Sequence, residues 1–407
     1  MEEWKEYNLG QLVELKNGVA FKSSEFIEQG IPVIKIKNVK PNRILLDDLS
    51  FVSYKSSLNK KCFDIRPTDI LITMTGNRKD GGADSWVGKV ALFNHAGRYL
   101  LNQRVSAIRV KDNSLVDNVY LSYLLSGWDA QLYFVNHSNS SGGQANISPD
   151  IVYNYAVSLP PLSVQYKISS ILKSLDDKIE VNRKINENLE QQAQALFKSW
   201  FVDFDPFKNG EFVESELGMI PKGWRVGSIY DYIDVVYGAP YKSSLFNDKK
   251  EGLPLIRIRD LKTNAPQFYT PEILPNTEFV KAGDIVAGMD AEFIPYVWLG
   301  EKGVLNQRCC KFRGKNEAIS NYYILFLIKP ELEYVQSYKT GTTVSHLGKS
   351  DIDRFRFVTP PLDVVKSFSD LVDGMLKELV NRANESRRLA ELRDTLLPKL
   401  MSGELKV

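Results

Sequence analysis

The sequence predicts an α+β protein in which two similar mixed α and β domains are separated by two long antiparallel helices that form a coiled-coil spacer. Two observations predict this fold class. Motifs recur in the same order in both halves, where GVAFKSSEF, IPVIKIKN, LNQR and SLPPLS are matched by GAPYKSSLF, LPLIRIRD, LNQR and TPPLD. A long stretch with helical periodicity follows each proline pair. A chain that repeats itself is built from related units, so we expect an internal pseudo-two-fold repeat.

The spacing between matching residues indicates where the two halves differ in length. Lys22 and Lys242 are 220 positions apart, whereas Pro160 and Pro360 are 200 positions apart, and the step of 200 then holds along both helical stretches. Insertions and deletions therefore fall inside the domains. The two helices keep the same length, as expected for a spacer.

Five segments follow from these patterns. Short β-rich runs separated by Gly, Asn and Asp predict mixed domains, and a proline pair ends each one because proline cannot continue a strand ladder. We expect the first domain over 1–159, the first spacer helix over 160–203, a connector over 204–223, the second domain over 224–359, and the second spacer helix with a C-terminal tail over 360–407.

Each long helix carries a heptad seam. Apolar residues recur in alternating steps of three and four, which is typical of helices that pack along one another, and both seams become polar in the middle, which fixes register. The alternative is that each helix lies on its own domain core. Ser163 and Asp363 are the predicted N-caps. The seam residues are Leu172, Leu175, Ile179, Asn182, Asn186, Leu189, Ala193, Leu196 and Trp200 in the first helix, and Val372, Met375, Leu379, Arg382, Ser386, Leu389, Arg393, Leu396 and Leu400 in the second.

Composition excludes several classes of protein. The 407 residues contain no run of about 18 apolar residues, which argues against a membrane span, and the N-terminal MEEWKEYNLG is too polar for a signal peptide. Only three cysteines are present, two of them adjacent at Cys309 and Cys310, which argues against a disulfide framework and fits a cytoplasmic protein. The net charge is +2, so a DNA binder of this composition must concentrate its positive charge locally or share binding with a partner.

No catalytic constellation or metal site is predicted. The three histidines, His95, His137 and His346, have no spacing typical of a metal site or a catalytic triad. SLPPLS and TPPLD lack the Asn or Asp and the aromatic residue of the adenine methyltransferase loop. We therefore expect a chain that is not itself an enzyme.

Polar, basic and aromatic residues on expected loops form a candidate DNA-binding set. Arg and Lys read guanine edges, Asn and Gln read adenine, acidic groups accept from cytosine, and Ser and Thr mostly hold phosphates. The candidates are Lys22, Ser23, Ser24, Lys35, Lys37, Asn38, Asn77, Arg78, Lys79, Trp86, Asn102, Gln103 and Arg104 in the first domain, and Lys242, Ser243, Ser244, Arg257, Arg259, Asp260, Asp290, Asn306, Gln307, Arg308, Lys339, Thr342 and Thr343 in the second.

More than one interpretation remains open for these residues. LNQR recurs in both domains, so its Asn, Gln and Arg either hold structure and phosphates or read bases. The loop over 75–86 has a counterpart of different chemistry in GMDAEFIPYVW, which makes this region the better candidate for sequence specificity. Charged loops are also often only solvated surface.

The doubled arrangement, SELGMIPKGW ahead of the second unit, LNQR in each unit, GTT before a strand and PPL opening a long helix resemble the specificity subunits of type I restriction-modification systems. The resemblance implies two target-recognition domains, each reading one half of an asymmetric bipartite site in double-stranded DNA. It implies that the helices set the gap and dock two methyltransferase subunits, which bring S-adenosylmethionine and methylate adenine at N6. Two restriction subunits would add ATP- and Mg-dependent translocation and cleavage, while this chain itself would hold no cofactor.

Two other classes of function compete with this interpretation. An enzyme, such as a fused methyltransferase or an unusual nuclease, would act alone, and the missing cofactor loop argues against it. A scaffold would pair proteins through its coiled coil without touching DNA, and the near-neutral charge leaves that alternative open.

Overall fold

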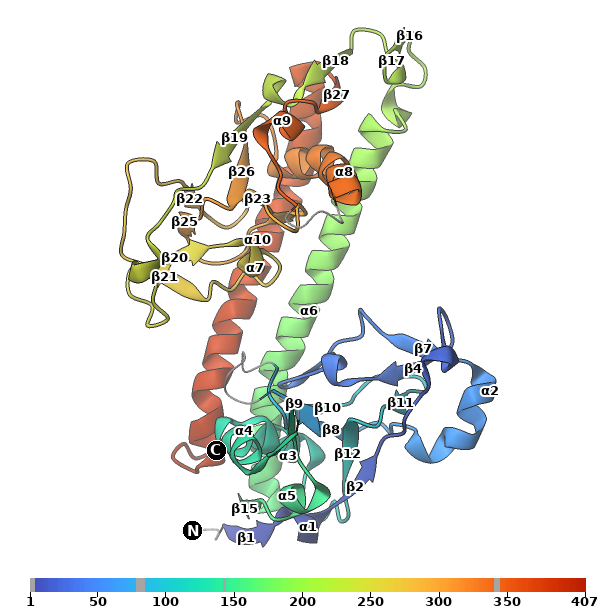
Figure 1. The fold of residues 1–407 in the computed structure, drawn as a ribbon, viewed down its shortest axis with the longest axis vertical. Helices are drawn as coiled ribbons and strands as arrows, with labels where there is room; N and C mark the ends of the chain where they lie inside the picture. Colours follow the sequence, from blue (N-terminus) through green and yellow to red (C-terminus); the bar gives the residue numbers. More distant parts are fainter. Residues whose placement is uncertain (1–3, 78–84, 142–143, 340–344) are drawn as a thin grey trace. The chain divides into compact units, whose positions relative to one another are not determined.

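The computed structural model describes residues 4–77, 85–141, 144–339 and 345–407 (Figure 1). The chain divides into two compact units: unit 1 comprises Met1–Asp177 with Ala390–Val407, and unit 2 comprises Lys178–Leu389. Two long helices, α6 (Leu162–Phe201) and α10 (Leu362–Met401), each contribute one part to each unit.

In its described residues, unit 1 contains two four-stranded sheets and three smaller strand groups. One sheet has the order β10-β8-β12-β2 and the other the order β11-β4-β7-β3. Their strands are β2 (Val13–Asn17), β3 (Phe26–Ile27), β4 (Ile31–Ile34), β7 (Ser50–Val52), β8 (Ile70–Thr73), β10 (Val90–Leu92), β11 (Leu100–Leu101) and β12 (Val105–Val110). The smaller groups are β1 (Lys5–Asn8) with β15 (Ala156–Leu159), β5 (Val39–Lys40) with β6 (Arg43–Ile44), and β13 (Asn139–Ser141) with β14 (Gln144–Asn146) and β9 (Thr75–Gly76).

In its described residues, unit 2 repeats both large sheets, but the second sheet gains its fourth strand at the opposite edge: β3 pairs with β7 in unit 1, whereas β22 pairs with β25, the counterpart of β11. The orders are β24-β23-β26-β19 and β22-β25-β20-β21. Their strands are β19 (Ile233–Tyr237), β20 (Leu253–Ile256), β21 (Phe268–Thr270), β22 (Phe279–Val280), β23 (Ile285–Gly288), β24 (Pro295–Val297), β25 (Gly303–Leu305) and β26 (Cys309–Gly314). Two strand pairs complete the unit: β16 (Phe212–Ser215) with β17 (Gly218–Pro221), and β18 (Arg225–Ser228) with β27 (Arg356–Thr359). The repeat predicted from the motifs is therefore a repeat of the fold.

Shorter helices complete each unit. In Figure 1, α3 and α4 lie beside the sheet of β8, β10 and β12 in unit 1, and α8 lies close to β23 in unit 2. The helices of unit 1 are α1 (Leu9–Leu12), α2 (Tyr54–Ser57), α3 (Asn118–Ser126), α4 (Trp128–His137) and α5 (Pro149–Tyr153). Those of unit 2 are α7 (Ile258–Leu261), α8 (Asn321–Lys339) and α9 (Lys349–Ile352).

The long helices start slightly earlier than predicted. They begin at Leu162 and Leu362, so Ser163 and Asp363 lie in the first turn and are not N-caps. The preceding proline explains the difference, because its fixed φ suits helix entry. The carbonyl oxygen of Pro161 accepts hydrogen bonds from the backbone N–H groups of Val164 and Gln165.

The two long helices pack antiparallel along the predicted seams. Within unit 2, the Asn182 side chain donates to Glu385 (2.8 Å), while Asn186, one turn later, donates to the Leu379 carbonyl (3.3 Å). As the residue number increases along α6, the number of its contact residue in α10 decreases, so the two helices run in opposite directions. Every predicted seam residue is buried or half-buried. The alternative that each helix lies only on its own domain core is therefore wrong.

The polar seam positions hydrogen-bond one another. Asn182 is completely buried; its Nδ2 also donates to Ser386 Oγ (3.2 Å), and its Oδ1 accepts from Arg382 Nη1 (3.2 Å). Within unit 1, Arg393 Nη1 lies 2.6 Å from Asp176 Oδ1, and the Tyr123 hydroxyl donates to Asp176 Oδ2 at 2.5 Å. These bonds fix the register that the apolar positions alone leave open.

Helix and sheet share one core in each unit. In unit 2 the core joins Phe197 and Phe201 of α6 to Phe368 and Val372 of α10 and to Phe312 of β26. In unit 1 a core built around β2, β8 and β12 includes residues of both helices, among them Leu172 and Leu400. Among the described residues, none of the helices is both long enough and apolar enough to cross a membrane.

Candidate nucleic-acid interface

The LNQR motif forms the same turn in both units. In unit 1 it links β11 to β12, and β11 runs parallel to β4. Asn102 donates its backbone N–H to the Ile34 carbonyl (3.1 Å), and Asn306 does the same to Ile256 (3.0 Å). Gly18 faces the first turn and Gly238 the second. Each position requires glycine, because an added Cβ would lie only 2.1 Å from the backbone carbonyl oxygen of Asn102 or Asn306. The recurrence of the motif is thus partly a requirement of the fold.

The turn places a glutamine and an arginine at the surface of each unit. Gln103, Arg104, Gln307 and Arg308 are exposed, whereas Asn102 is half-buried and Asn306 is buried. The Asn306 Oδ1 accepts the backbone N–H of Arg308 at 3.2 Å, so this amide holds the turn in shape. The exposed Gln and Arg are the members of the motif that a ligand can reach.

Arg308 is part of a charged cluster. Its Nη1 lies 2.8 Å from Asp290 Oδ2, and the other carboxylate oxygen of Asp290 lies 2.6 Å from His346 Nδ1. The side chain of Asp290 is 19% exposed, compared with 57% for Arg308 and 51% for His346. A largely shielded carboxylate therefore holds two exposed donor groups.

The matching position in unit 1 has neutral chemistry. Arg104 Nη1 donates to the Gln144 side-chain oxygen at 3.3 Å, and Thr75 Oγ1 donates to Asn146 Oδ1 at 2.8 Å. Thr75 pairs with Asn146 in the β9–β14 ladder, just as Asp290 pairs with His346 in an isolated bridge. The two units thus present different side chains on one backbone framework.

The backbone framework around the turn is held by equivalent hydrogen bonds in both units. Met74 donates its N–H to the Arg104 carbonyl (2.9 Å), and Met289 donates to Arg308 (2.8 Å). The same two methionine carbonyls accept from Ile147 (3.0 Å) and Leu347 (2.7 Å). Thr75 lies in the loop over 75–86, and Gln144 and Asn146 lie in the segment HSNSSGGQAN, both of which were expected to be exposed polar loops, whereas His346 was not a candidate. The sequence did indicate that Asn146 and His346 are equivalent, because they are 200 positions apart, the same spacing that relates the two long helices.

The Lys-Ser-Ser motifs form short exposed turns. Ser23–Glu25 and Ser243–Leu245 are 3-10 turns, and the side chains of both motifs, Lys22-Ser23-Ser24 and Lys242-Ser243-Ser244, are exposed. Glu25 caps the first turn through the Lys22 N–H, and Glu272 accepts the Lys242 N–H, both at 2.8 Å. Their exposed hydroxyls and ammonium groups suit phosphate contacts.

Two further candidate cations lie over aromatic rings. Lys35 Nζ is 3.7 Å from the centroid of Phe26, and Arg257 Cζ is 4.3 Å from that of Phe268. Burial, followed by repulsion from Lys37, lowers the pKa of Lys35. Lys37 is exposed and pairs with Asp48 at 2.5 Å. Of the two neighbouring candidates Arg257 and Arg259, Arg259 is exposed and Arg257 is half-buried.

Three predicted contact residues, Asn38, Asp260 and Trp86, are corrected because they are buried, and a fourth, Lys339, is half-buried and paired. Asn38 is 1% exposed and its amide donates to the Leu45 and Asp48 carbonyls, while Asp260 is completely buried and accepts the Arg257 N–H. Trp86 is a core residue, 7% exposed. The Lys339 ammonium donates to the His346 carbonyl and to Asp351. Asn38, Asp260 and Trp86 are therefore out of reach of a base, whereas Lys339 is half-buried and takes part in the fold's own hydrogen bonds.

The loops on which specificity was expected are partly outside the described residues. Arg78, Lys79, Thr342 and Thr343 lie there. Asn77 is described and exposed, and it donates to Ser85 Oγ at 3.1 Å. Trp128, which was not selected, packs on Trp86 with ring centroids 5.7 Å apart and is 60% exposed. Trp128 thus presents an exposed aromatic ring beside the buried Trp86.

The comparison with known protein families decides the class of this protein. The model of the type I restriction modification DNA specificity domain matches residues 1–191 and again 221–385. The chain belongs to this family. It is a type I restriction-modification specificity subunit with a DNA-recognition function.

Relatives and a solved structure agree with this assignment. The type I restriction enzyme MjaIX specificity subunit of Methanocaldococcus jannaschii is 29% identical over 333 residues, which is 75% of this chain and 73% of that protein. The HindI specificity subunit of Haemophilus influenzae is 23% identical, with both chains covered completely. The crystal structure of the S subunit from M. genitalium matches with a TM-score of 0.54 at 13% identity, covering 98% of this chain and 96% of that one. The last similarity concerns the fold alone.

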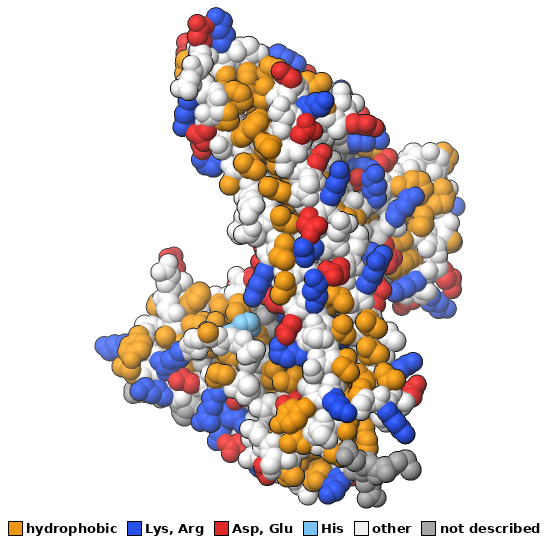
Figure 2. All heavy atoms as spheres, turned by 180° about the vertical axis from the view of Figure 1, so that it is seen from behind, with side chains coloured by type: hydrophobic (Ala, Val, Ile, Leu, Met, Phe, Trp, Pro, Cys, Tyr) orange, Lys and Arg blue, Asp and Glu red, His pale blue; other side chains and the backbone are white. Residues whose placement is uncertain are grey.

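The distribution of charge on this specificity subunit is mixed. Figure 2 shows Lys and Arg side chains interspersed with Asp and Glu on the face drawn, without a continuous basic field. In α6, Arg183 pairs with Glu180 (2.8 Å) and with Glu187. On the face drawn, positive charge is therefore divided among local groups.

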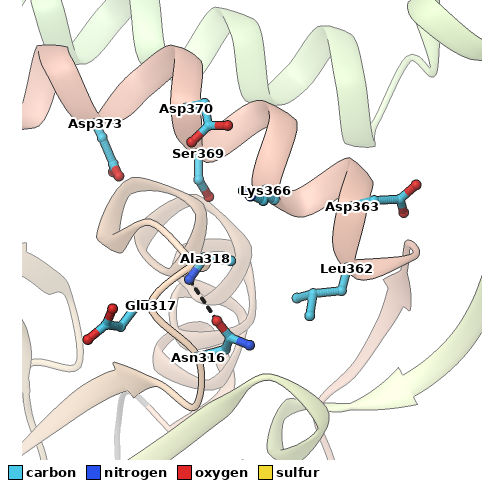
Figure 3. A pocket seen from close by; sticks show the side chains of 9 residues that line it. All are labelled: Asn316, Glu317, Ala318, Leu362, Asp363, Lys366, Ser369, Asp370 and Asp373. Atoms are coloured by element: carbon cyan, nitrogen blue, oxygen red, sulfur yellow. Dashed lines mark hydrogen bonds between the residues drawn. The ribbon is translucent and has the colours of Figure 1, made fainter.

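A depression of about 590 Å³ lies beside the start of α10 (Figure 3). Its lining includes Asp363, Asp370 and Asp373 from α10 together with Glu317, with Lys366 as its one basic residue, and Ala318 donates its N–H to Asn316 Oδ1 at 2.9 Å. Its acidic lining is unsuited to phosphate. In the described ranges, no three His, Cys, Asp or Glu residues are grouped so as to hold a metal ion.

Proposed function

We propose that this specificity subunit reads an asymmetric bipartite site in double-stranded DNA, with one domain for each half-site. Residues 1–159 and 224–359 are the proposed recognition domains, 160–203 and 360–407 the spacer helices, and 204–223 the connector. One observation carries the proposal: equivalent turns on one framework present Arg104 with Gln144 in unit 1 but Arg308 with Asp290 and His346 in unit 2. Domains of one fold with different surface chemistry suit two unlike half-sites.

The spacer helices set the gap between half-sites. A helix of 40 residues is about 60 Å long, which exceeds the rise of one DNA turn. Both seams contain buried polar contacts that fix the register of the pair, as at Asn182. A spacer of fixed register keeps a fixed number of unread base pairs between the two halves.

The outer faces of the helices dock partner proteins. Apolar side chains remain exposed on both helices, where packing of a further helix would bury them. The proposed partners are two methyltransferase subunits, which supply S-adenosylmethionine and adenine-N6 methylation, and two restriction subunits that use ATP and Mg. The exposed apolar residues of the two helices include Ile171, Val181, Leu371 and Leu392.

DNA binding by the assembled complex tests this proposal. The chain is co-purified with its methyltransferase subunits, and its affinity for DNA is measured at several salt concentrations. One duplex has a random sequence, and the other contains the motif that the complex methylates. We expect sequence-selective, salt-dependent binding, with neither methylation nor cleavage by the chain alone. Absence of salt-sensitive binding by the complex would support the scaffold alternative, and methyl transfer or cleavage by the isolated chain would support the enzyme alternative.

A further inference from the structure

We propose that Arg308 reads a guanine in the half-site of the second domain, whereas Arg104, at the same place in the first domain, holds a DNA phosphate. This inference rests on the proposed function. It assigns different tasks to the two copies of one motif, LNQR, from the groups that surround each arginine.

Arg308 is already positioned for a planar ligand. Asp290 holds Nη1 of the guanidinium at 2.8 Å, and Asp290 is itself fixed by His346 at 2.6 Å. A guanidinium has five N–H donors in a fixed fork, so one held nitrogen leaves donors for another partner. A bidentate bond to guanine O6 and N7 needs such a fork, and holding it in place reduces the entropy lost on binding.

The same carboxylate makes Arg308 a poor phosphate ligand. Asp290 lies within ion-pair distance, so the net charge of the pair is near zero, and its oxygen atoms would repel a phosphate. Guanine acceptor atoms carry only partial charges and do not suffer that repulsion. The cluster therefore favours a base edge over the DNA backbone.

Arg104 has a different environment. Its Nη1 is held by the neutral Gln144 amide at 3.3 Å, and in the described part of unit 1 it forms no ion pair. Thr75 and Asn146, which replace Asp290 and His346 on the framework, are also uncharged. The full positive charge of Arg104 remains available to a phosphate.

The test compares the two matched substitutions, Arg308→Ala and Arg104→Ala, in the complex with the methyltransferase subunits. Affinity is measured for the cognate duplex and for every single-base variant of both half-sites, over a series of salt concentrations. Arg308→Ala should weaken cognate binding by about tenfold or more and abolish discrimination at one G·C pair of one half-site. Arg104→Ala should weaken all duplexes by a similar factor and lower the salt slope by about one.

Two further variants keep the test interpretable if an alanine variant folds poorly. Arg308→Lys retains the charge but not the fork, and Asp290→Asn retains the shape but not the carboxylate. Both should reduce discrimination at the same base pair while thermal melting stays unchanged. A uniform loss of affinity in Arg308→Ala, or a changed sequence preference in Arg104→Ala, would overturn the inference. Failure of the wild-type complex to select any sequence would instead reject the proposed function.

Discussion

Gly238 and Gly18 determine how closely each LNQR turn approaches the neighbouring strand. A Cβ at either position would lie 2.1 Å from a backbone carbonyl oxygen, which cannot move as a flexible side chain can. Only glycine therefore fits between the end of the strand and the turn. The position of the arginine in each turn depends on this approach.

Gly238→Ala should destabilise unit 2 by about 2 kcal/mol, as for other overpacked sites. The control is Gly374→Ala in α10, where no atom lies within 4 Å of the added methyl group and the better helix propensity should stabilise by up to about 1 kcal/mol. Thermal melting followed by circular dichroism measures both variants. Equal melting temperatures for the two would show that the close approach does not constrain the turn.

Cys309 and Cys310 should be inert in the native protein. Both are completely buried, and burial raises the pKa of the Cys310 thiol to about 12 and that of Cys309 well above its usual range. The thiolate is the reactive form, and a raised pKa leaves the thiol protonated at every pH up to that value. Iodoacetamide at pH 8 followed by peptide mapping should label neither residue until guanidinium unfolds the chain. Rapid native labelling of either would contradict the buried position.

At single residues, sequence reasoning identified the turns but not which side chains the fold itself uses. Asn38, Asp260 and Trp86 have the chemistry of DNA contacts, yet each is buried. Burial depends on residues that are distant in the chain. The pairing of Gln144 with Arg104 and that of His346 with Asp290 could not be predicted for the same reason, because the partners lie 40 and 56 positions apart.

Among the elements, the long helices were the most predictable. Their seams could be read from a strict heptad period, and every seam position is buried or half-buried. The cross-helix partners could not be read, because the period says which face packs but not how far one helix is shifted along the other. The same limit applies to the sheets, where the parallel pairing of β4 with β11 follows from tertiary packing.

Asp176→Ala tests the polar contact between the helices in unit 1. It leaves the half-buried Arg393 guanidinium and the Tyr123 hydroxyl without this acceptor and should cost about 2 kcal/mol. The neighbouring Asp177→Ala is the control, because Asp177 forms an exposed ion pair with Lys173 on the same helix and should cost about 0.5 kcal/mol or less. Urea unfolding compares the two. Equal losses would mean that the inter-helix network contributes no more than a surface pair.

For the whole molecule, the doubled motifs predicted the doubled fold. Insertions lie within the domains, so the step between matching residues falls from 220 at Lys22 to 200 at Pro160 and then stays constant. Equal helix lengths of 40 residues follow from that constant step. The bases read by each domain could not be predicted, because they depend on side chains that converge from several loops on one surface.

The central claim is that the helices act as a ruler between two unlike readers. Lengthening both helices at the boundary between the units tests it, with four residues inserted after Asp177 and four after Leu389. Four residues add about 6 Å of helix, equivalent to about one or two base pairs of DNA. The matched control inserts four residues in the exposed Ser215–Gly218 turn between β16 and β17, outside the helices.

The most direct measurement is a genome-wide map of methylated adenines after co-expression of the chain with its methyltransferase subunits. The wild-type chain and the control should yield one bipartite motif with two different halves and a fixed gap. The lengthened chain should yield the same two halves with a longer gap. A contiguous motif, or a lengthened chain that methylates the original site with its gap unchanged, would contradict the account.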